Sequence, residues 1–196
     1  MAASDSRTHE NYIEEFTRSL PNVPQTGETL LVFALEHHYT DFAMQVCDKH
    51  SDLDINDPQN WTKNSPLMVS IQYSPAQLVE FLLTKFKVSD INWRNDDGVS
   101  FILQAARRKS MGILKKIVGL YKEQIAINTS DNYGENPLLF SAKHNKLSLV
   151  KYFCESFDDI EINHLDDGNY TALIYAASHA NLEMCQYIID KYSDVD

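Results

Sequence analysis

A short phrase returns along this chain at nearly constant intervals, and this repetition constrains the fold more than any other feature of the sequence. The phrase is Asp-Ile-Asn or a close variant, and its last residue is Asn56, Asn92, Asn128, Asn163 and Asp196. The intervals are 36, 36, 35 and 33 residues. A period of this length is typical of a solenoid, in which each structural unit contacts only its neighbours and the product is one long surface.

A second phrase keeps the same period and predicts the start of a helix in each copy. It consists of Ser, Thr or Asn followed by apolar residues, and its first residues are Thr29, Ser65, Ser100, Asn136 and Thr171. Small residues such as Ala105-Ala106 follow, which lets neighbouring helices approach closely.

A second helix is predicted further along each copy. Apolar residues recur there at i, i+1, i+4 and i+5, as in Leu149, Val150, Phe153 and Cys154. This spacing follows the turn of a helix and gives it one buried stripe. Turn-forming pairs separate the copies, and they are Asp97-Gly98, Tyr133-Gly134 and Asp167-Gly168. Because no copy can bury its own stripe alone, neighbouring copies must stack.

The repeated unit resembles the ankyrin repeat. That family's pattern runs roughly D-x-x-G-x-T-P-L-H-x-A-A, then G-H-L-E-I-V-x-x-L-L, then G-A-D-V-N. The fifth copy is most similar, with Thr171-Ala172-Leu173, Asn181-Leu182-Glu183 and Asp194-Val195-Asp196. The resemblance covers the chain from about Gly27 to its end. It implies an all-α ankyrin-repeat solenoid, a right-handed stack of helix-turn-helix units with β-turn or hairpin-like connecting loops.

One family position differs in every copy. The glycine after the second helix is replaced by His50, Phe86, Tyr121, Phe157 and Tyr192. Copies two to four are also longer beyond this residue, so we expect a wider loop in them, packed by a ring instead of capped by a glycine.

The domain prediction divides the chain in two. Residues 1–25 are an N-terminal capping helix and linker, and residues 26–196 are the repeat domain. The five copies span about 26–56, 57–92, 93–128, 129–163 and 164–196. Within the cap, Tyr12, Ile13, Phe16 and Leu20 recur at helical spacing, and Pro21 and Pro24 end the helix. A docking helix for a partner is the alternative interpretation of this segment.

The final copy keeps apolar residues where a solenoid normally ends in polar ones. Ile174, Met184 and Ile188 are the main examples. We therefore expect the sequence to be the N-terminal piece of a longer protein.

Cysteine usage and hydropathy suggest where the protein resides. Cys47, Cys154 and Cys185 all fall on second-helix stripes, which is typical of reduced cysteines in an intracellular protein. No window holds about 20 uninterrupted apolar residues, so no membrane span is expected. We predict a cytoplasmic monomer.

Function must come from exposed positions, because folding uses the stripes. The resemblance implies that turn tips and the outward faces of first helices line a concave binding surface. The predicted partner-binding residues are Trp61, Thr62, Tyr73, Asp96, Asp97, Arg107, Arg108, Tyr133, Glu135, Lys143, His144, Tyr170 and His179.

These residues suggest an acidic stripe with aromatic rings at the tips and a basic ridge across copies three and four. Trp61, Tyr133 and Tyr170 are the predicted anchors, since exposed Trp and Tyr dominate binding hot spots. The structural alternative is that each ring lies flat on its own turn. The run Arg107-Arg108-Lys109 has an alternative too, because cations at a helix C-terminus complement its dipole.

Other functional classes find little support. The sequence contains no nucleotide-binding glycine loop, no nucleophile elbow and no zinc-binding motif, so we expect no catalysis, metal or cofactor. A net charge of −11 disfavours nucleic acid and favours a protein or peptide partner of basic or mixed charge. The predicted function is a protein-interaction scaffold or adaptor. The alternative is the target-recruiting segment of a larger multidomain enzyme, such as a secreted bacterial effector in a host cytosol.

Overall fold

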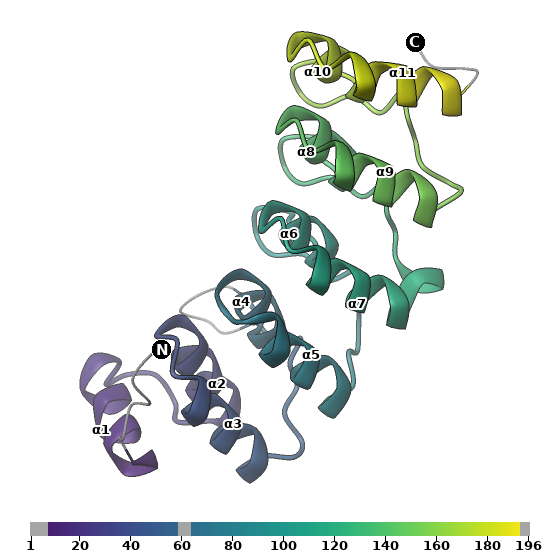
Figure 1. The fold of residues 1–196 in the computed structure, drawn as a ribbon. Helices are drawn as coiled ribbons and strands as arrows, with labels where there is room; N and C mark the ends of the chain where they lie inside the picture. Colours follow the sequence, from purple (N-terminus) through teal and green to yellow (C-terminus); the bar gives the residue numbers. More distant parts are fainter. Residues whose placement is uncertain (1–7, 59–63, 193–196) are drawn as a thin grey trace, which may run out of the picture. The chain divides into compact units, whose positions relative to one another are not determined.

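The protein is all-α. The computed structural model describes residues 8–58 and 64–192, which contain eleven α-helices, one short 3-10 helix and no strand (Figure 1). A single isolated bridge pairs Arg94 with Ser100. The predicted fold class is confirmed, while Trp61, Thr62 and the final phrase 194–196 lie outside the described residues. The chain divides into two compact units, residues 1–89 and 90–196, and each is described by itself.

The first unit contains a single helix followed by two helix pairs. Its helices are α1 (His9–Ser19), α2 (Gly27–Glu36), α3 (Thr40–Lys49), α4 (Pro66–Tyr73) and α5 (Ala76–Lys85). Helix α1 packs on α2 and α3, and α2 packs on α4. The Tyr12 ring stacks on Phe42 at 4.7 Å between centroids, and Phe16 meets Phe33 edge-on at 5.2 Å. Helix α1 thus caps the first copy as its sequence predicts.

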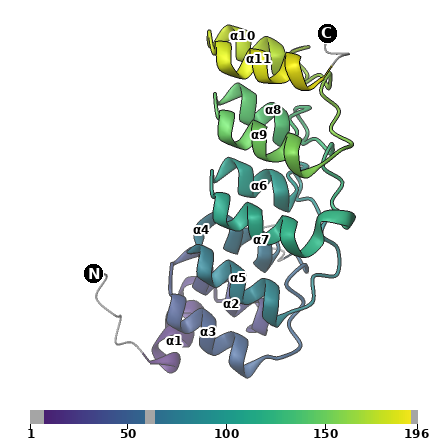
Figure 2. The same ribbon diagram turned by 45° about the vertical axis from the view of Figure 1, so that its right-hand side comes forward.

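The second unit contains three stacked helix pairs. Its elements are α6 (Phe101–Arg107), α7 (Met111–Tyr121), η1 (Lys122–Gln124), α8 (Pro137–Lys143), α9 (Leu147–Ser156), α10 (Ala172–Ser178) and α11 (Leu182–Lys191). The first helices α6, α8 and α10 form one row and the second helices α7, α9 and α11 form another (Figures 1 and 2). Helix α8 lies between α6 and α10 and packs on both.

The second repeated phrase fixes the start of the first helices. Ser65, Ser100, Asn136 and Thr171 are N-cap residues, and each side-chain oxygen accepts a hydrogen bond from the backbone N–H three residues later. Such caps satisfy donors that a helix leaves unpaired. The first copy differs, because α2 begins three residues before the phrase suggests, with Thr26 as its N-cap.

The Ile-Asn phrase recurs because it links one copy to the next. Ile91 and Ile127 are buried, and the amides of the following asparagines reach the next copy. Asn92 donates to the Gln124 carbonyl at 2.7 Å and accepts from the Ala126 N–H at 2.8 Å. Asn128 makes the equivalent pair of bonds one copy later, at 2.6 and 3.0 Å.

Aromatic residues end the second helices, as the sequence predicts. Phe86 and Phe157 are C-cap residues and are buried. Tyr121 is instead the last residue of α7, and η1 follows it.

The last copy buries part of its apolar stripe, since Met184 and Ile188 are fully buried. Among its described residues, the large apolar side chains that remain exposed are Leu165, Tyr170, Ile174, Leu182 and Ile189.

The cysteines are free, as predicted. Cys47 and Cys154 are buried and Cys185 is half-buried. Desolvation raises the pKa of the Cys47 thiol to about 12, so this thiol is neutral and unreactive at pH 7.

Candidate functional site

Three turn loops of the second unit share one backbone structure. They begin at Asn95, Asp131 and Asp166, and each side-chain Oδ1 accepts hydrogen bonds from the backbone N–H groups two and four residues later. The three loops are therefore equivalent residue by residue, and Asp97, Tyr133 and Gly168 occupy the same tip position in each.

The equivalent loops need a left-handed residue just before the helix. Gly98 and Gly134 take this position, with φ of +77° and +75°. In the fifth copy the residue is Asn169, with φ of +60°. The predicted Asp167-Gly168 turn is thus displaced by one residue, since the loop begins at Asp166 and Asn tolerates this backbone.

Backbone hydrogen bonds join successive tips. The Asn132 N–H donates to the Asp97 carbonyl at 2.9 Å, and the Asp167 N–H donates to the Tyr133 carbonyl at 3.2 Å. The Asn132 side-chain amide also donates to the Asp96 carbonyl at 2.8 Å. We call residues 96–97, 132–133 and 167–168 the tip row. These bonds hold the tip row in place and do not involve the side chains of Asp97, Tyr133 and Asp167.

Tyr133 is the most prominent side chain of the tip row. It is 68% exposed, and within the part of the chain that the structure describes no other ring stacks on it. Asp97 and Asp167, which flank it in the row, are exposed and have no ion-pair partner among residues 8–58 and 64–192. Asp96 is exposed as well.

Tyr170 has a different environment. It occupies the position equivalent to Glu135 in its loop, is 45% exposed, and stacks on Tyr175 at 5.2 Å between centroids. The Tyr175 hydroxyl donates to Asp166 Oδ2. Desolvation raises the pKa of Asp166, but the bonds from Tyr175, Tyr170 and Gly168 outweigh it, so the net pKa lies below the ordinary value.

The centre of this face is a network of internal ion pairs. Arg107 donates to Asp131 and, at 3.0 Å, to Glu135. Lys143 pairs with the other oxygen of Glu135 at 3.1 Å. Asp131 and Glu135 are both only 7% exposed. We call Arg107, Asp131, Glu135 and Lys143 the central cluster.

This network corrects two expectations. Glu135 is not an exposed tip residue, because its position in the loop points it towards Arg107 and Lys143. Those two cations do not form a free basic ridge either, since both are bound to carboxylates. Asp131, Asp166 and Tyr175 were missed as organisers of this face. The signal for the two aspartates was present, because each is the first residue of a D-x-x-G-like loop.

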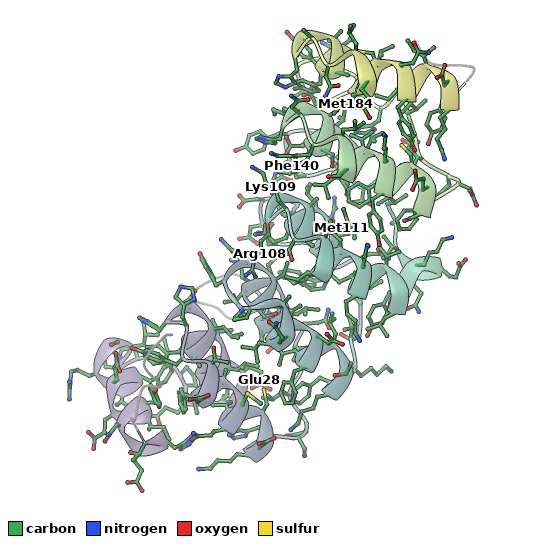
Figure 3. The ribbon with its side chains drawn as sticks, viewed as in Figure 1. Glu28, Arg108, Lys109, Met111, Phe140 and Met184 are labelled. Atoms are coloured by element: carbon green, nitrogen blue, oxygen red, sulfur yellow. The ribbon has the colours of Figure 1, made fainter. Side chains whose placement is uncertain are left out.

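The connections between paired helices carry the remaining cations. Lys109 and Asn145 hold equivalent left-handed positions, with φ of +57° and +55°. Lys109 and His144 are exposed, Lys146 is half-buried, and the His144 ring lies 4.3 Å from the Phe140 centroid. Figure 3 labels Lys109, which lies between α6 and α7, and Phe140, which lies in α8. We call Lys109, His144 and Lys146 the connection cluster.

Two further predicted residues also lie on these connections. Arg108 is half-buried, and desolvation lowers its pKa. His179 is exposed, and its Nε2 lies 2.8 Å from the Lys143 carbonyl oxygen, which ties the fifth copy to the fourth.

Tyr73 belongs to the first unit. It is exposed at the end of α4, where its hydroxyl accepts a hydrogen bond from Gln72 at 3.0 Å and His38 meets its ring edge-on at 6.2 Å.

Within residues 8–58 and 64–192, no group of three His, Cys, Asp or Glu side chains is arranged to hold a metal ion. No helix in these ranges combines the length and apolar character needed to cross a membrane.

Comparisons with known proteins agree with the repeat architecture. A family model described as ankyrin repeats (3 copies) matches residues 101–196. Neurogenic locus notch homolog protein 1 from Homo sapiens and from Mus musculus are each 27% identical over 123 residues, 63% of this chain. The Xenopus tropicalis protein is 24% identical over 132 residues, or 67% of the chain. The chain spans only about 5% of the length of these relatives. Residues 101–196 therefore match the ankyrin repeat model, and the chain is similar to proteins that contain such repeats.

Proposed function

We propose that the second unit is a protein-interaction module, which binds a protein or peptide on the tip row and the neighbouring first helices. Ankyrin repeats are in general protein–protein interaction modules and are typically not catalytic. In this proposal the protein works as a scaffold or adaptor.

The observation that carries the proposal is the exposure of Tyr133. A tyrosine that is 68% exposed, on a backbone fixed by tip-to-tip hydrogen bonds, offers a large contact area with little entropy left to lose. Tyr170 is a weaker anchor, because its stacking on Tyr175 supports the structural alternative for that ring.

Charge supports a partner that is basic in the segment reaching the tips. Asp97 and Asp167 flank the Tyr133 ring, and neither is neutralised by a cation among the described residues. A Lys or Arg of the partner over this ring would gain a cation–π contact and two nearby carboxylates. The net charge of −11 would also speed the encounter with a basic segment.

Location and oligomeric state belong to the same proposal. The three free cysteines support a cytoplasmic protein, and we expect a monomer that offers its surface to a different chain.

A peptide selection tests the proposal. Peptides that bind the full chain are selected from a random library, and their affinities are measured by calorimetry for wild type, Tyr133→Ala and Leu120→Ala. Leu120 is an exposed apolar residue on α7, away from the tip row, and serves as the control. We expect Tyr133→Ala to weaken binding roughly 30-fold, the size of a hot-spot truncation of about 2 kcal/mol. Leu120→Ala should change little. Unchanged affinity of every selected peptide for Tyr133→Ala would reject the proposed anchor.

A further inference from the structure

We infer that the connection cluster, Lys109 with His144 and Lys146, is a second subsite that receives acidic side chains of the partner segment. The inference rests on the proposed function, because it assumes that this same face binds a protein. It also predicts how charge is arranged along the partner segment: a basic part binds the tip row and an acidic part binds the connection cluster.

The charges on this face fall into two groups. Arg107 and Lys143 are bound to the carboxylates of the central cluster. Lys109 and Lys146 have no ion-pair partner in the described part of the chain. The acids divide in the same way, since Asp131 and Glu135 are bound and Asp97 and Asp167 are not. Internal pairing thus leaves free carboxylates at the tips and free amines at the connections.

Lys109 stands at a backbone position that does not favour a lysine. Its φ of +57° is a left-handed conformation that glycine adopts freely and that costs a β-carbon-bearing residue stability. A lysine there presents its ammonium group on an exposed connection at a position where glycine would suit the fold better. The conformation itself recurs at Asn145 and Ala180, so what distinguishes Lys109 is the exposed ammonium group that it places on the connection.

The lysines of the connection cluster create a local positive field on an acidic protein. The pKa of His144 is lowered, first by desolvation and then by Lys109, Lys143 and Lys146, against an opposite effect of Glu135. The geometry agrees, because connections of neighbouring copies lie side by side: the Asn181 amide donates to Asn145 at 2.6 Å, and these two residues occupy the positions that Lys146 and Lys109 hold one copy earlier. The connection cluster is therefore positive, whereas the chain as a whole has a net charge of −11.

Discrete carboxylates suit this site better than a continuous polyanion. A nucleic-acid backbone laid across the same face would meet the free carboxylates of the tip row, which repel it. A peptide can place acidic side chains at one end and basic side chains at the other, and so match both groups.

Two peptide probes test the inference on the full chain. Fluorescein-labelled hexaglutamate and hexalysine are titrated at low salt, with anisotropy as the readout. The variants are Lys109→Gly, His144→Gln and the double variant Lys109→Gly with Lys146→Gln. Lys115→Gln on the exposed face of α7 is the matched control for loss of one positive charge.

We expect wild type to bind hexaglutamate in spite of its net negative charge. Lys109→Gly should weaken that binding about three-fold, as for loss of one exposed ion pair, and the double variant should abolish it. Lys109→Gly should also raise the melting temperature, because it relieves the left-handed backbone, so reduced binding cannot come from unfolding. Lys115→Gln should bind as wild type does.

No binding of hexaglutamate by wild type, or equal binding by wild type and the double variant, would overturn the inference. Hexalysine tests the tip row separately. Loss of hexalysine binding in Asp97→Asn with Asp167→Asn, with hexaglutamate binding kept, supports two separate subsites. If hexaglutamate binds as expected but hexalysine does not bind, the proposed basic partner fails while the connection cluster stands.

Discussion

At the scale of single residues, the helix connections hold an unusual set of backbone conformations. The left-handed residues there are His38, Lys109, Asn145 and Ala180, none of which is glycine. Asparagine and histidine are enriched in this conformation, whereas lysine and alanine are not. The connections at Lys109 and Ala180 therefore carry an avoidable backbone cost, and the protein is not at its stability optimum.

Ala180→Gly should stabilise the protein. The left-handed backbone costs alanine more than glycine loses in unfolded-state entropy, so we expect a gain of about 0.5 to 1 kcal/mol in the free energy of unfolding. Ala177→Gly is the matched control, because Ala177 lies within helix α10 and should lose about 1 kcal/mol instead. Urea denaturation measures both. Equal destabilisation by the two variants would contradict the backbone argument.

Asp166 provides a test by pH. Its pKa lies below the ordinary value in the folded state because the hydrogen bonds to the carboxylate outweigh desolvation. The resulting stability is fully present above the unfolded pKa of about 3.9 and is lost as pH falls through the lower folded value.

Removing the Tyr175 hydroxyl should raise the pH at which Asp166 becomes protonated. Tyr175→Phe deletes one bond to the carboxylate, so the pKa of Asp166 should rise towards its ordinary value. A titration of the Asp166 carboxyl carbon by NMR measures the change, with Tyr152→Phe on α9 as control. An unchanged Asp166 titration in Tyr175→Phe would show that the hydroxyl does not hold the carboxylate.

At the scale of elements, the asparagine of each Ile-Asn phrase works as a clip between copies. Asn128→Ala removes two hydrogen bonds to the loop that contains Asp159 and Glu161. These bonds are exposed, so the expected loss is about 1 kcal/mol in the free energy of unfolding. Asn11→Ala on α1 is a control without such a clip and should change stability little. A loss in Asn11→Ala as large as in Asn128→Ala would argue against the clip.

Most elements could be predicted from the sequence because their signals are local. Local structure is determined by the residues nearby: N-cap residues start helices, apolar stripes set their buried faces, and Gly98 and Gly134 set the turns. The start of helix α2 differs from the prediction because Thr26 and Thr29 are both suitable N-cap residues, and only packing decides between them. The fifth turn was misjudged because Gly168 looked like the left-handed residue, whereas spacing from Asp166 selects Asn169.

The candidate site was harder to predict, since its central cluster depends on pairing between copies. Arg107 in copy three and Lys143 in copy four both converge on Glu135, which no local pattern indicates. The exposure of Tyr133 and Asp97 could be predicted, because tip positions follow directly from the loop register.

At the scale of the whole molecule, a mutation that destabilises one copy of the second unit should also destabilise the neighbouring copies. Phe153 is fully buried in α9, and Phe153→Ala should cost about 3 to 5 kcal/mol. Because a repeat buries its stripe against its neighbours, α10 and α11 should lose protection along with α8 and α9. Hydrogen exchange followed by mass spectrometry measures this. Faster exchange confined to α8 and α9 would contradict a stack held by shared interfaces.

The central claim is that this stack uses its stripes and ion pairs for folding and leaves the tip row and the connection cluster for a partner. The most direct test is an NMR titration of the isotopically labelled chain with a selected binding peptide, following every backbone amide. We predict the largest shifts at residues 96–97, 132–133 and 167–168, with further shifts at Lys109 and His144. Shifts concentrated on α7, α9 and α11, with the tip row unchanged, would contradict the account.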